Sequence, residues 1–296
     1  SAGIATLSPD GDNLILTKFA SEKTTSDSID RVKAKINDHY GHNIGIAHTR
    51  WATHGGKTDQ NSHPHTDQHG RIAIVHNGTI NNAYEMKKKL IADGVKFTSE
   101  TDTEVVAQLI GTFLDKGYNL KDSVSHSLSM CDGSWGIAVL HKSNPKEIVV
   151  ACNGSPMTIG LGHGKTYIAS EPSAFSKYTK SFISMKDGEI ATVRASESEG
   201  LDISRIQQAP ENDVLLTPAP YAHFTLKEMI EQPEAIGRAI GYGARMNGKE
   251  IVLGGLDTNE LLLAQIKNLV LVGCGTSKHA AELGARIMRD LGCFET

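Results

Sequence analysis

The residues best suited to chemistry lie in two glycine-containing segments, 48–55 and 76–78. The first is His-Thr-Arg-Trp-Ala-Thr-His-Gly, and the second is His-Asn-Gly. The guanidinium group of Arg50 can form paired hydrogen bonds with a carboxylate. The side-chain amide of Asn77 and the unobstructed N–H of Gly78 can stabilise an oxyanion. Together these groups predict a site that holds a small amino acid and promotes attack on its carbonyl group.

Each of these features also has a simpler structural explanation. Arg50 and Trp51 could stack on one another at the protein surface. Asn77 and Gly78 could form a type I′ hairpin turn. Asp102 could serve only as an acidic residue in the first turn of a helix, where it interacts favourably with the helix dipole. These alternatives remain open at this point.

Two further patterns indicate neither a metal site nor a nucleotide site. The segment 160–166 resembles a phosphate loop, but Ile159 stands where the Walker A pattern requires glycine, so a turn between strands is the better interpretation. The six histidines between residues 48 and 76 match no zinc spacing, and no metal ligand set is expected. They are His48, His54, His63, His65, His69 and His76.

The segment Gly273-Cys-Gly-Thr-Ser277 offers a second place for an anion. Its glycines allow close approach of the backbone, and the N–H groups at the start of the following helix favour a phosphate. The hydroxyl groups of Thr276 and Ser277 could add hydrogen bonds. A tight strand-to-helix turn with a serine N-cap explains the same residues equally well.

The composition excludes several classes of function. The 296 residues include 30 basic and 34 acidic ones, a net charge of −4, which leaves no basic surface for nucleic acid and no polybasic patch for a membrane. Apolar stretches such as 269–272 are far too short to cross a bilayer. The four cysteines are scattered without a Cys-x-x-Cys pair, which is typical of reduced thiols in a cytoplasmic protein. They are Cys131, Cys152, Cys274 and Cys293.

The first two hundred residues alternate between short strands and a few helices, an α+β pattern. The chain predicts a hairpin over 1–16, a helix over 28–40 that ends at Gly41, and a strand over 43–48 that leads to Arg50. A strand over 71–76 leads to Asn77, and a helix covers 81–93. Residues 101–104 form a capping box at the start of another helix. Further strands are predicted over 136–141, 147–151, 167–170 and 189–193.

The pattern changes after residue 207. Three prolines between 209 and 220 indicate a linker. Helices are predicted from 225 to about 246, over 258–265 and over 278–291, with an apolar strand over 268–272. A strand, a glycine-rich turn and a helix are the start of an α/β domain. One such unit is too small to bury a core, so both ends of the sequence are expected to be truncated.

These segments closely resemble one known family. Residues 48–55, 76–78 and 99–104 resemble the glutaminase domain of glutamine–fructose-6-phosphate aminotransferases. The opening Ser-Ala-Gly-Ile resembles the end of that family's Arg-Gly-Tyr-Asp-Ser-Ala-Gly segment. Residues 227–233 and 274–277 resemble the entry to its sugar-isomerase half. The similarity runs through essentially the whole chain in the same order.

The resemblance implies an α+β fold, the αββα sandwich of the N-terminal-nucleophile hydrolases, over 1–208. A linker at 209–224 and the start of an α/β sugar-isomerase domain at 225–296 would follow. The implied reaction takes ammonia from glutamine to fructose-6-phosphate and gives glucosamine-6-phosphate and glutamate, which begins hexosamine synthesis. No metal or organic cofactor is implied. The two substrates are the expected partners, and the family generally assembles as a homo-oligomer through its isomerase half.

The resemblance also implies roles for the residues around the amino-acid site. Arg50 would bind the α-carboxylate of glutamine, with further contacts from Thr53 and His54. Asp102 would accept hydrogen bonds from the α-ammonium group. Trp51 would help to gate the path of ammonia to the sugar site.

The remaining implied roles concern the oxyanion and the sugar phosphate. Asn77 and Gly78 would form the oxyanion hole. The family's nucleophile is an N-terminal cysteine whose own α-amine is the base, and this cysteine and the first strand would precede Ser1. No cysteine of the chain can replace it, because each has its amine in a peptide bond, so the chain by itself is expected to be inactive. The sugar phosphate would be bound by Cys274, Gly275, Thr276 and Ser277.

Two other interpretations remain. The chain could belong to another class II amidotransferase, such as the phosphoribosylamine-forming enzyme or an asparagine synthetase, although 232–233 and 274–277 argue against these. It could also be a non-catalytic sensor of glutamine or sugar phosphate that has lost its nucleophile.

Overall fold

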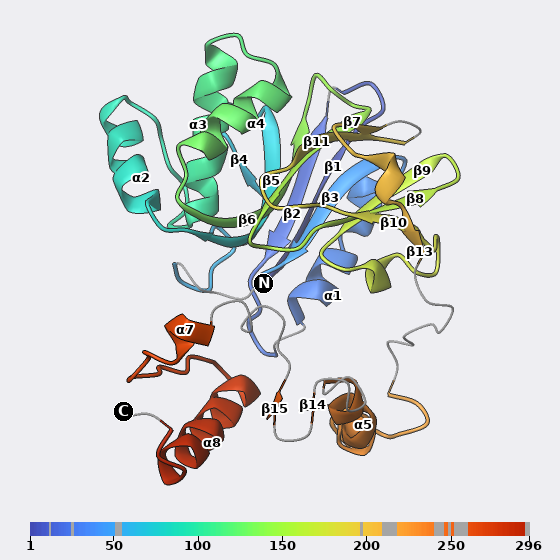
Figure 1. The fold of residues 1–296 in the computed structure, drawn as a ribbon. Coiled ribbons are helices and arrows are strands. Elements are labelled where there is room, and N and C mark those ends of the chain that lie inside the picture. The colour runs from blue at the N-terminus through green and yellow to red at the C-terminus, as the bar shows by residue number, and fades with distance from the viewer. Residues whose placement is uncertain are drawn as a thin grey trace. The chain divides into compact units, whose positions relative to one another are not determined.

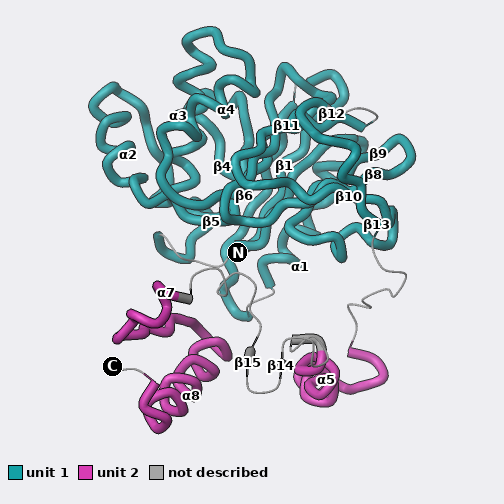
Figure 2. Tube along the Cα trace, in the orientation of Figure 1, with its two compact units in different colours: residues 1–214 teal, residues 215–296 magenta. Residues whose placement is uncertain are grey.

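The computed structural model describes residues 1–11, 13–24, 27–50, 55–195, 198–208, 218–239, 246–247, 250–251 and 260–293. The chain divides into two compact units, Ser1–Val214 and Leu215–Thr296 (Figure 2). The boundary falls inside the segment 209–224 that the sequence predicts to be a linker. Unit 1 therefore contains Arg50, Asn77 and Asp102, and unit 2 contains residues 274–277.

A six-stranded antiparallel sheet lies at the centre of unit 1 (Figure 1). Its spatial order is β12-β11-β7-β6-β5-β4. Runs of valine and isoleucine form its middle strands, because β-branched side chains pack well on a pleated surface. The longest pairing joins β5 to β6, from Ile72 opposite His141 to Ile80 opposite Gly133. The strands are β4 (His65–Thr66), β5 (Ile72–Ile80), β6 (Gly133–His141), β7 (Glu147–Asn153), β11 (Ile190–Arg194) and β12 (Ser198–Glu199).

Two smaller antiparallel sheets form the second layer of strands. One has the order β2-β1-β3, and the other has the order β13-β10-β8-β9. Within the described residues, β3 and β9 each have a neighbouring strand on one side only, so each is an edge strand. The strands are β1 (Ala2–Leu7), β2 (Leu14–Phe19), β3 (Ile44–Thr49), β8 (Thr158–Gly162), β9 (Lys165–Ala169), β10 (Ser181–Ser184) and β13 (Gln207–Gln208).

Three helices cover one face of the six-stranded sheet (Figure 1). They are α2 (Ala83–Ala92), α3 (Asp102–Asp115) and α4 (Leu120–Ser129). Their apolar sides pack on alternate residues of β5 and β6, such as Ile74 and Ile137, and both of these isoleucines are completely buried. Burial of this kind is the main stabilising contribution of the fold.

The residues of β5 and β6 that alternate with these point to the second layer. Val75 and Ala138 pack there with Ile46 of β3 and Ile159 of β8. On the far side of that layer, α1 (Asp27–Lys33) and the 3-10 helix η1 (Ile36–His39) pack against β1 and β2. The order of layers is therefore helices, sheet, sheets, helix, which is the αββα arrangement expected from the sequence.

The expected single helix over 28–40 is wrong in its second half. The α-helix ends at Lys33, and the chain continues through a turn into η1. The tighter 3-10 turn places the His39 ring against two strands, with hydrogen bonds to the hydroxyls of Thr6 (2.7 Å) and Thr17 (2.9 Å). Tertiary hydrogen bonds thus override the local preference for a continuous helix.

The capping box predicted at the start of α3 is confirmed in one of its two bonds, because the Thr101 N–H donates to the Ser99 hydroxyl (3.3 Å) and not to Glu104. The Thr101 hydroxyl accepts a hydrogen bond from the Glu104 N–H (3.3 Å). The carboxylate of Glu104 is 1% exposed and accepts from the N–H groups of Thr98 (2.8 Å) and Ser99 (2.5 Å). These bonds fix the approach of the chain to the helix, and they set the position of Asp102 as its first residue.

Unit 2 contains less regular structure. The expected strand over 268–272 is wrong, because residues 266–274 have no regular secondary structure, and Val270 and Val272 are 81% and 89% exposed. No strand among the described residues pairs with this segment, and a strand forms only with a hydrogen-bonding neighbour. The elements are α5 (Phe224–Ala239), β14 (Met246–Asn247), β15 (Glu250–Ile251), α7 (Glu260–Leu263) and α8 (Thr276–Asp290).

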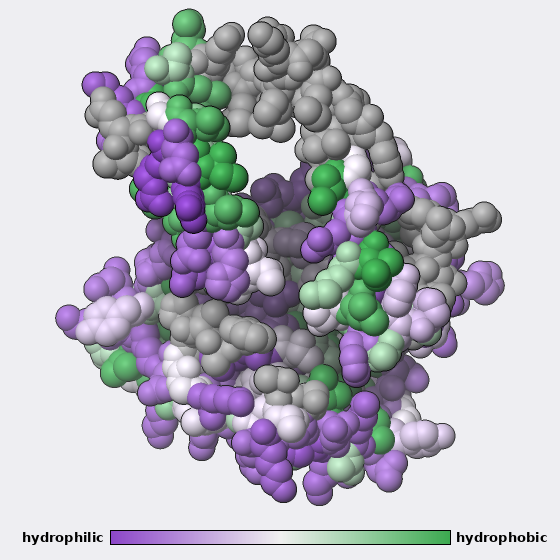
Figure 3. Space-filling view, turned by 90° about the horizontal axis from the view of Figure 1, so that it is seen from below, coloured by the Kyte–Doolittle hydropathy of each residue, from purple (hydrophilic) through white to green (hydrophobic). Residues whose placement is uncertain are grey.

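Large apolar side chains are exposed on α7 and α8. Leu261, Leu283 and Leu291 are between 60% and 84% exposed. Figure 3 shows hydrophobic side chains at the surface of the part of the molecule that carries these helices. Exposed apolar surface of this kind is typical of a contact region.

Candidate active site

Arg50 follows the last residue of β3 and is largely buried, with 9% of its surface exposed. Its backbone is fixed by a pair of hydrogen bonds with Ser1, in which the Arg50 N–H donates to the Ser1 carbonyl (2.8 Å) and the Ser1 amine donates to the Arg50 carbonyl (3.1 Å). Burial lowers the pKa of Arg50 from its ordinary value, and the negative charge of Asp102 acts in the opposite direction. The guanidinium group of Arg50 therefore interacts electrostatically with the carboxylate of Asp102, which is predicted to share its site.

Asp102 connects the start of α3 to the end of β5. One carboxylate oxygen accepts a hydrogen bond from the N–H of Ile80 (2.9 Å), and the other accepts from the N–H of Thr103 (3.0 Å). The side chain is buried, with 7% of the residue exposed. Ile80 lies three residues after Asn77, about 10 Å along a strand. The carboxylate therefore belongs to the same region as Asn77 and Arg50.

Asn77 and Gly78 lie inside β5, opposite Gly136 and Trp135 of β6. The type I′ turn is therefore the wrong interpretation of this dipeptide. Gly78 has a φ of +133°, and a Cβ atom there would lie 2.2 Å from the carbonyl oxygen of Ser134. Only glycine fits at this position.

The Asn77 side chain is exposed and is held at both ends. Its carbonyl oxygen lies 2.7 Å from Nε2 of His48, and its amide nitrogen donates to the Ser170 hydroxyl (3.0 Å). His48 precedes Arg50 by two residues, so the hydrogen bond joins the segment of Arg50 to the segment of Asn77. Through these contacts the structure brings Arg50, Asn77 and Asp102 into one region of unit 1.

Two further histidines, His63 and His65, form a buried group beside this region. The ring of His63 lies 4.5 Å from that of His48 and 5.1 Å from that of His65, measured between centroids. Burial lowers the pKa of His65 to about 2 and lowers the pKa of His63 well below its ordinary value. These imidazoles are neutral at pH 7, and so they add no charge to the region.

No set of three or more histidine, cysteine or acidic side chains in the described ranges is placed to hold a metal ion. His65 and His76 make hydrogen bonds to hydroxyl groups instead, His65 Nε2 to Thr101 (3.0 Å) and His76 Nδ1 to Thr103 (3.0 Å). Both partners belong to the first turns of α3 or to its cap, so these histidines support the helix that carries Asp102.

A cavity of about 360 Å³ extends from Asn77 between the edge strands β3 and β9. Its lining includes His48 and Ser170 at one end, and a second cavity of about 470 Å³ continues past Asn43 and Lys165 at the other end. The two cavities share Ile148 and residues 166–168. A long, largely apolar gap therefore separates two strand edges and ends at the Asn77 side chain.

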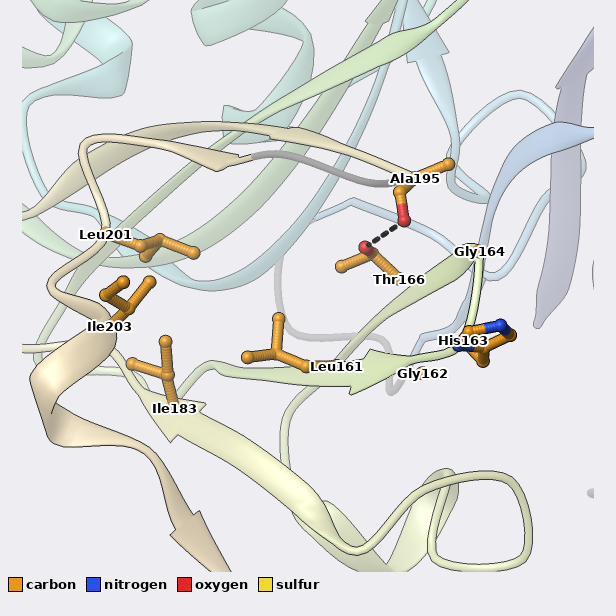
Figure 4. A pocket seen from close by; sticks show the side chains of 9 residues that line it. All are labelled: Leu161, Gly162, His163, Gly164, Thr166, Ile183, Ala195, Leu201 and Ile203. Atoms are coloured by element: carbon orange, nitrogen blue, oxygen red, sulfur yellow. Dashed lines mark hydrogen bonds between the residues drawn. The ribbon is translucent and has the colours of Figure 1, made fainter.

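The glycine-rich segment 160–166 forms the β8–β9 hairpin, and so the expected turn between strands is confirmed. Beside it lies a cavity of about 320 Å³, into which Leu161, Ile183, Leu201 and Ile203 point (Figure 4). The Thr166 hydroxyl at its rim donates to a backbone carbonyl (3.3 Å to Ala195). The apolar lining contains none of the residues predicted to bind substrate.

Three predicted site residues, Trp51, Thr53 and His54, lie outside the described residues. The predicted phosphate segment 274–277 lies at the start of α8, with Gly275 as its N-cap at a φ of +57°. The alternative of a serine N-cap is therefore wrong. Ser170 has no counterpart in the sequence interpretation, because its contact with Asn77 joins positions 93 residues apart and leaves no local signal.

Comparisons with known proteins show what this chain is similar to. Residues 48–177 match the family model described as a glutamine amidotransferase domain. A solved structure titled "structure of the allosteric regulatory enzyme of purine biosynthesis" shares 25% sequence identity, with a TM-score of 0.53 over 71% of this chain and 43% of that chain. The likeness is consistent with the expected N-terminal-nucleophile hydrolase fold. The family model thus identifies a glutamine amidotransferase domain in unit 1, over residues 48–177.

The relatives narrow this class further. The chain is 38% identical over 295 residues to the glutamine–fructose-6-phosphate aminotransferase (isomerizing) of Aquifex aeolicus, covering 96% of this chain and 46% of that protein. It is 35% identical over 298 residues to the enzyme of the same name from Bacteroides thetaiotaomicron, covering 98% and 48%. The chain is therefore a relative of the glutamine–fructose-6-phosphate aminotransferases and spans about half the length of the curated relatives it matches.

The helices were also searched for membrane spans. Within the described part of the chain, no helix combines the length and the apolar character needed to cross a bilayer.

Proposed function

We propose that this chain is the glutamine-hydrolysing part, with the start of the sugar-isomerase part, of a glutamine–fructose-6-phosphate aminotransferase. The whole protein would take ammonia from glutamine to fructose-6-phosphate and produce glucosamine-6-phosphate and glutamate in the cytoplasm. The observation that carries the proposal is the convergence of Arg50, Asp102 and Asn77 in one region of unit 1.

The charges of the site fit a free α-amino acid. The guanidinium group of Arg50 would bind the α-carboxylate of glutamine, and its burial strengthens such a bond because little water competes. Asp102 would bind the α-ammonium group with the lone pairs that Ile80 and Thr103 leave unused. Opposite charges on the protein thus match both charges of the ligand.

The amide group of Asn77 and the N–H of Gly78 would stabilise the oxyanion of the tetrahedral intermediate. Removing one such donor typically lowers kcat about 10²–10³-fold. Thr53 and His54 would add contacts to glutamine, and Trp51 would gate the path of ammonia.

The gap between β3 and β9 offers a place for the nucleophile that the family places before Ser1. Both strands run toward Asn77, and an extended segment between them would complete one continuous second sheet. A segment antiparallel to both would begin beside Asn77 and His48. A cysteine at that first position would have its thiol next to the oxyanion donors, and its free α-amine would be the base.

In unit 2, residues 225–296 would begin a sugar-isomerase domain, with residues 1–208 as the glutaminase domain and 209–224 as the linker. Cys274, Gly275, Thr276 and Ser277 would bind the phosphate of fructose-6-phosphate at the start of α8. The exposed apolar side chains of α7 and α8 would be covered by the rest of that domain and by a second subunit of a homo-oligomer. We propose no metal, cofactor, nucleic acid or membrane as a partner.

The direct test is an assay of the full-length protein that contains this chain. Incubation with glutamine and fructose-6-phosphate should yield glutamate and glucosamine-6-phosphate in equal amounts. Phosphoribosyl pyrophosphate, or aspartate with ATP, should not replace the sugar phosphate as acceptor. Production of phosphoribosylamine or asparagine would assign another amidotransferase, and absence of any glutamine hydrolysis would favour the non-catalytic sensor.

Amide hydrogen exchange tests separately whether a strand occupies the gap between β3 and β9. In the 296-residue chain, the outward N–H groups of β3 and β9 should exchange rapidly, because no strand pairs with them in the described structure. In the full-length protein the same N–H groups should be protected. Equal exchange in the two proteins would exclude a strand in the gap.

A further inference from the structure

The side-chain amide of Asn77 is fixed by one residue from each of two other sheets. His48 belongs to β3, Ser170 directly follows β9, and Asn77 itself belongs to β5. His48 Nε2 lies 2.7 Å from the carbonyl oxygen of the amide, and the Ser170 hydroxyl lies 3.0 Å from its nitrogen. Both distances are those of good hydrogen bonds.

The surroundings of His48 decide which of its ring nitrogens carries the proton. Nδ1 is buried and has no hydrogen-bond partner in the part of the chain that the structure describes. A proton on Nδ1 would therefore be a buried donor without an acceptor, which is unfavourable. Burial lowers the pKa of His48, so the ring is neutral at pH 7 and carries a single proton. That proton belongs on Nε2, where it can be donated to Asn77.

The proton on Nε2 in turn selects one of the two orientations of the amide. An amide that accepts from His48 must place its oxygen toward the ring and its nitrogen toward Ser170. The nitrogen then has a second N–H, which has no partner among the described residues and is free for an anion. In the reversed orientation, the amide oxygen would face the oxyanion and repel it.

We propose that His48 is a positioning residue, which donates its Nε2 proton to Asn77 and thereby keeps the second amide N–H of Asn77 turned toward the oxyanion. Ser170 accepts the first N–H and fixes the plane of the amide. The inference rests on the proposed function of Asn77 for its catalytic consequence, but the proton position and the amide orientation belong to the folded chain itself.

The first experiment measures the proton position without any activity. Nitrogen-15 NMR of the imidazole groups in the 296-residue chain, with His48→Gln used to assign the signals, should show His48 protonated on Nε2 and unprotonated on Nδ1. A proton on Nδ1, or a rapid exchange between the two tautomers, would overturn the proposal whatever reaction the full-length protein catalyses.

The second experiment uses two isosteric variants in the full-length protein. The amide nitrogen of glutamine in His48→Gln can occupy the place of Nε2, whereas that of asparagine in His48→Asn can reach only the place of Nδ1. We expect His48→Gln to keep kcat for glutamine hydrolysis within about threefold. We expect His48→Asn to lower kcat about tenfold or more and to leave KM for glutamine unchanged. This loss of kcat is smaller than the loss of about 10²–10³-fold expected when an oxyanion donor is missing.

Equal kcat values for the two variants would overturn the proposal, and so would a change confined to KM. Thermal unfolding of both variants separates positioning from folding, because a purely structural role would lower Tm and activity together. Ser170→Ala is a further control. It should lower kcat less than His48→Asn, since the imidazole still orients the amide when the serine hydroxyl is missing.

Discussion

Replacing Glu104 by alanine should destabilise unit 1 by about 3 kcal/mol. The buried carboxylate accepts from the N–H of Ser99 (2.5 Å) and from the side-chain amide of Gln108 (3.4 Å), and both donors are almost completely buried. Each buried donor that loses its acceptor costs about 1–3 kcal/mol. The N–H of Thr98 loses the same acceptor, but it can donate to water instead, because Thr98 is exposed.

Urea unfolding followed by tryptophan fluorescence measures this change. Both tryptophans of the chain, Trp51 and Trp135, lie in the residue range of unit 1, so the signal reports that unit. The midpoint should fall with an unchanged m value, and Tm should fall by about 6–12 °C for a domain of this size. Glu100→Ala is the matched control, because this neighbouring carboxylate likewise accepts hydrogen bonds, from the Gly56 N–H and the Asn61 amide, but is exposed. A loss below about 1 kcal/mol for Glu104→Ala, or an equal loss for the control, would refute the reasoning.

Three further changes test the site. Arg50→Lys in the full-length protein should raise KM for glutamine about tenfold or more, because lysine cannot form the paired bonds of a guanidinium group; an unchanged KM would remove Arg50 from the site. Gly78→Ala should lower stability by about 3 kcal/mol in urea unfolding, since the methyl group meets the Ser134 carbonyl at 2.2 Å; a stability equal to wild type would contradict this. Acidification should also destabilise unit 1 through His63 and His65. Both have lower pKa values in the folded state than in the unfolded chain, where histidine titrates near about 6.5, so the unfolded chain takes up protons first. The contribution of these two histidines to the free energy of unfolding should be fully present above about pH 6.5. Below this pH it should fall by about 1 kcal/mol per pH unit for each histidine, until the pH reaches the pKa of that histidine in the folded state. This pKa is about 2 for His65. Urea midpoints at pH 7.5 and 5.5 measure this, and His65→Gln should reduce the difference.

The parts of the fold that the sequence predicts correctly depend on local signals. The role of Thr101 as the N-cap of α3 follows from residues 101–104 alone, and the structure contains the hydrogen bond from the Glu104 N–H to its hydroxyl. Strands β5, β6 and β7 follow from runs of β-branched residues that pack in the core on both faces. Arg50 is likewise placed correctly after a strand, because only its own strand was needed to predict that position.

The parts that the sequence misses depend on distant contacts. Asn77 and Gly78 have the local signature of a turn, but their pairing with β6, more than fifty residues later, keeps them in a strand. Helix α4 escapes prediction because only Leu120, Val124 and Leu128 mark its apolar side among polar residues. The strand predicted over 268–272 is wrong because a distant contact is missing. Its apolar residues have no neighbouring strand among the described residues.

The amide of Asn77 lies at a junction of three sheets, and this has a consequence for the timing of catalysis. Moving the donor and the acceptor of either bond one ångström apart would lengthen that bond beyond 3.5 Å and release one end of the amide. The amide of Asn77, the proposed oxyanion donor, is therefore correctly oriented only after all three sheets have packed against one another. A nascent or partly unfolded subunit would lack this alignment, and under the proposed function it would not hydrolyse glutamine before folding is complete.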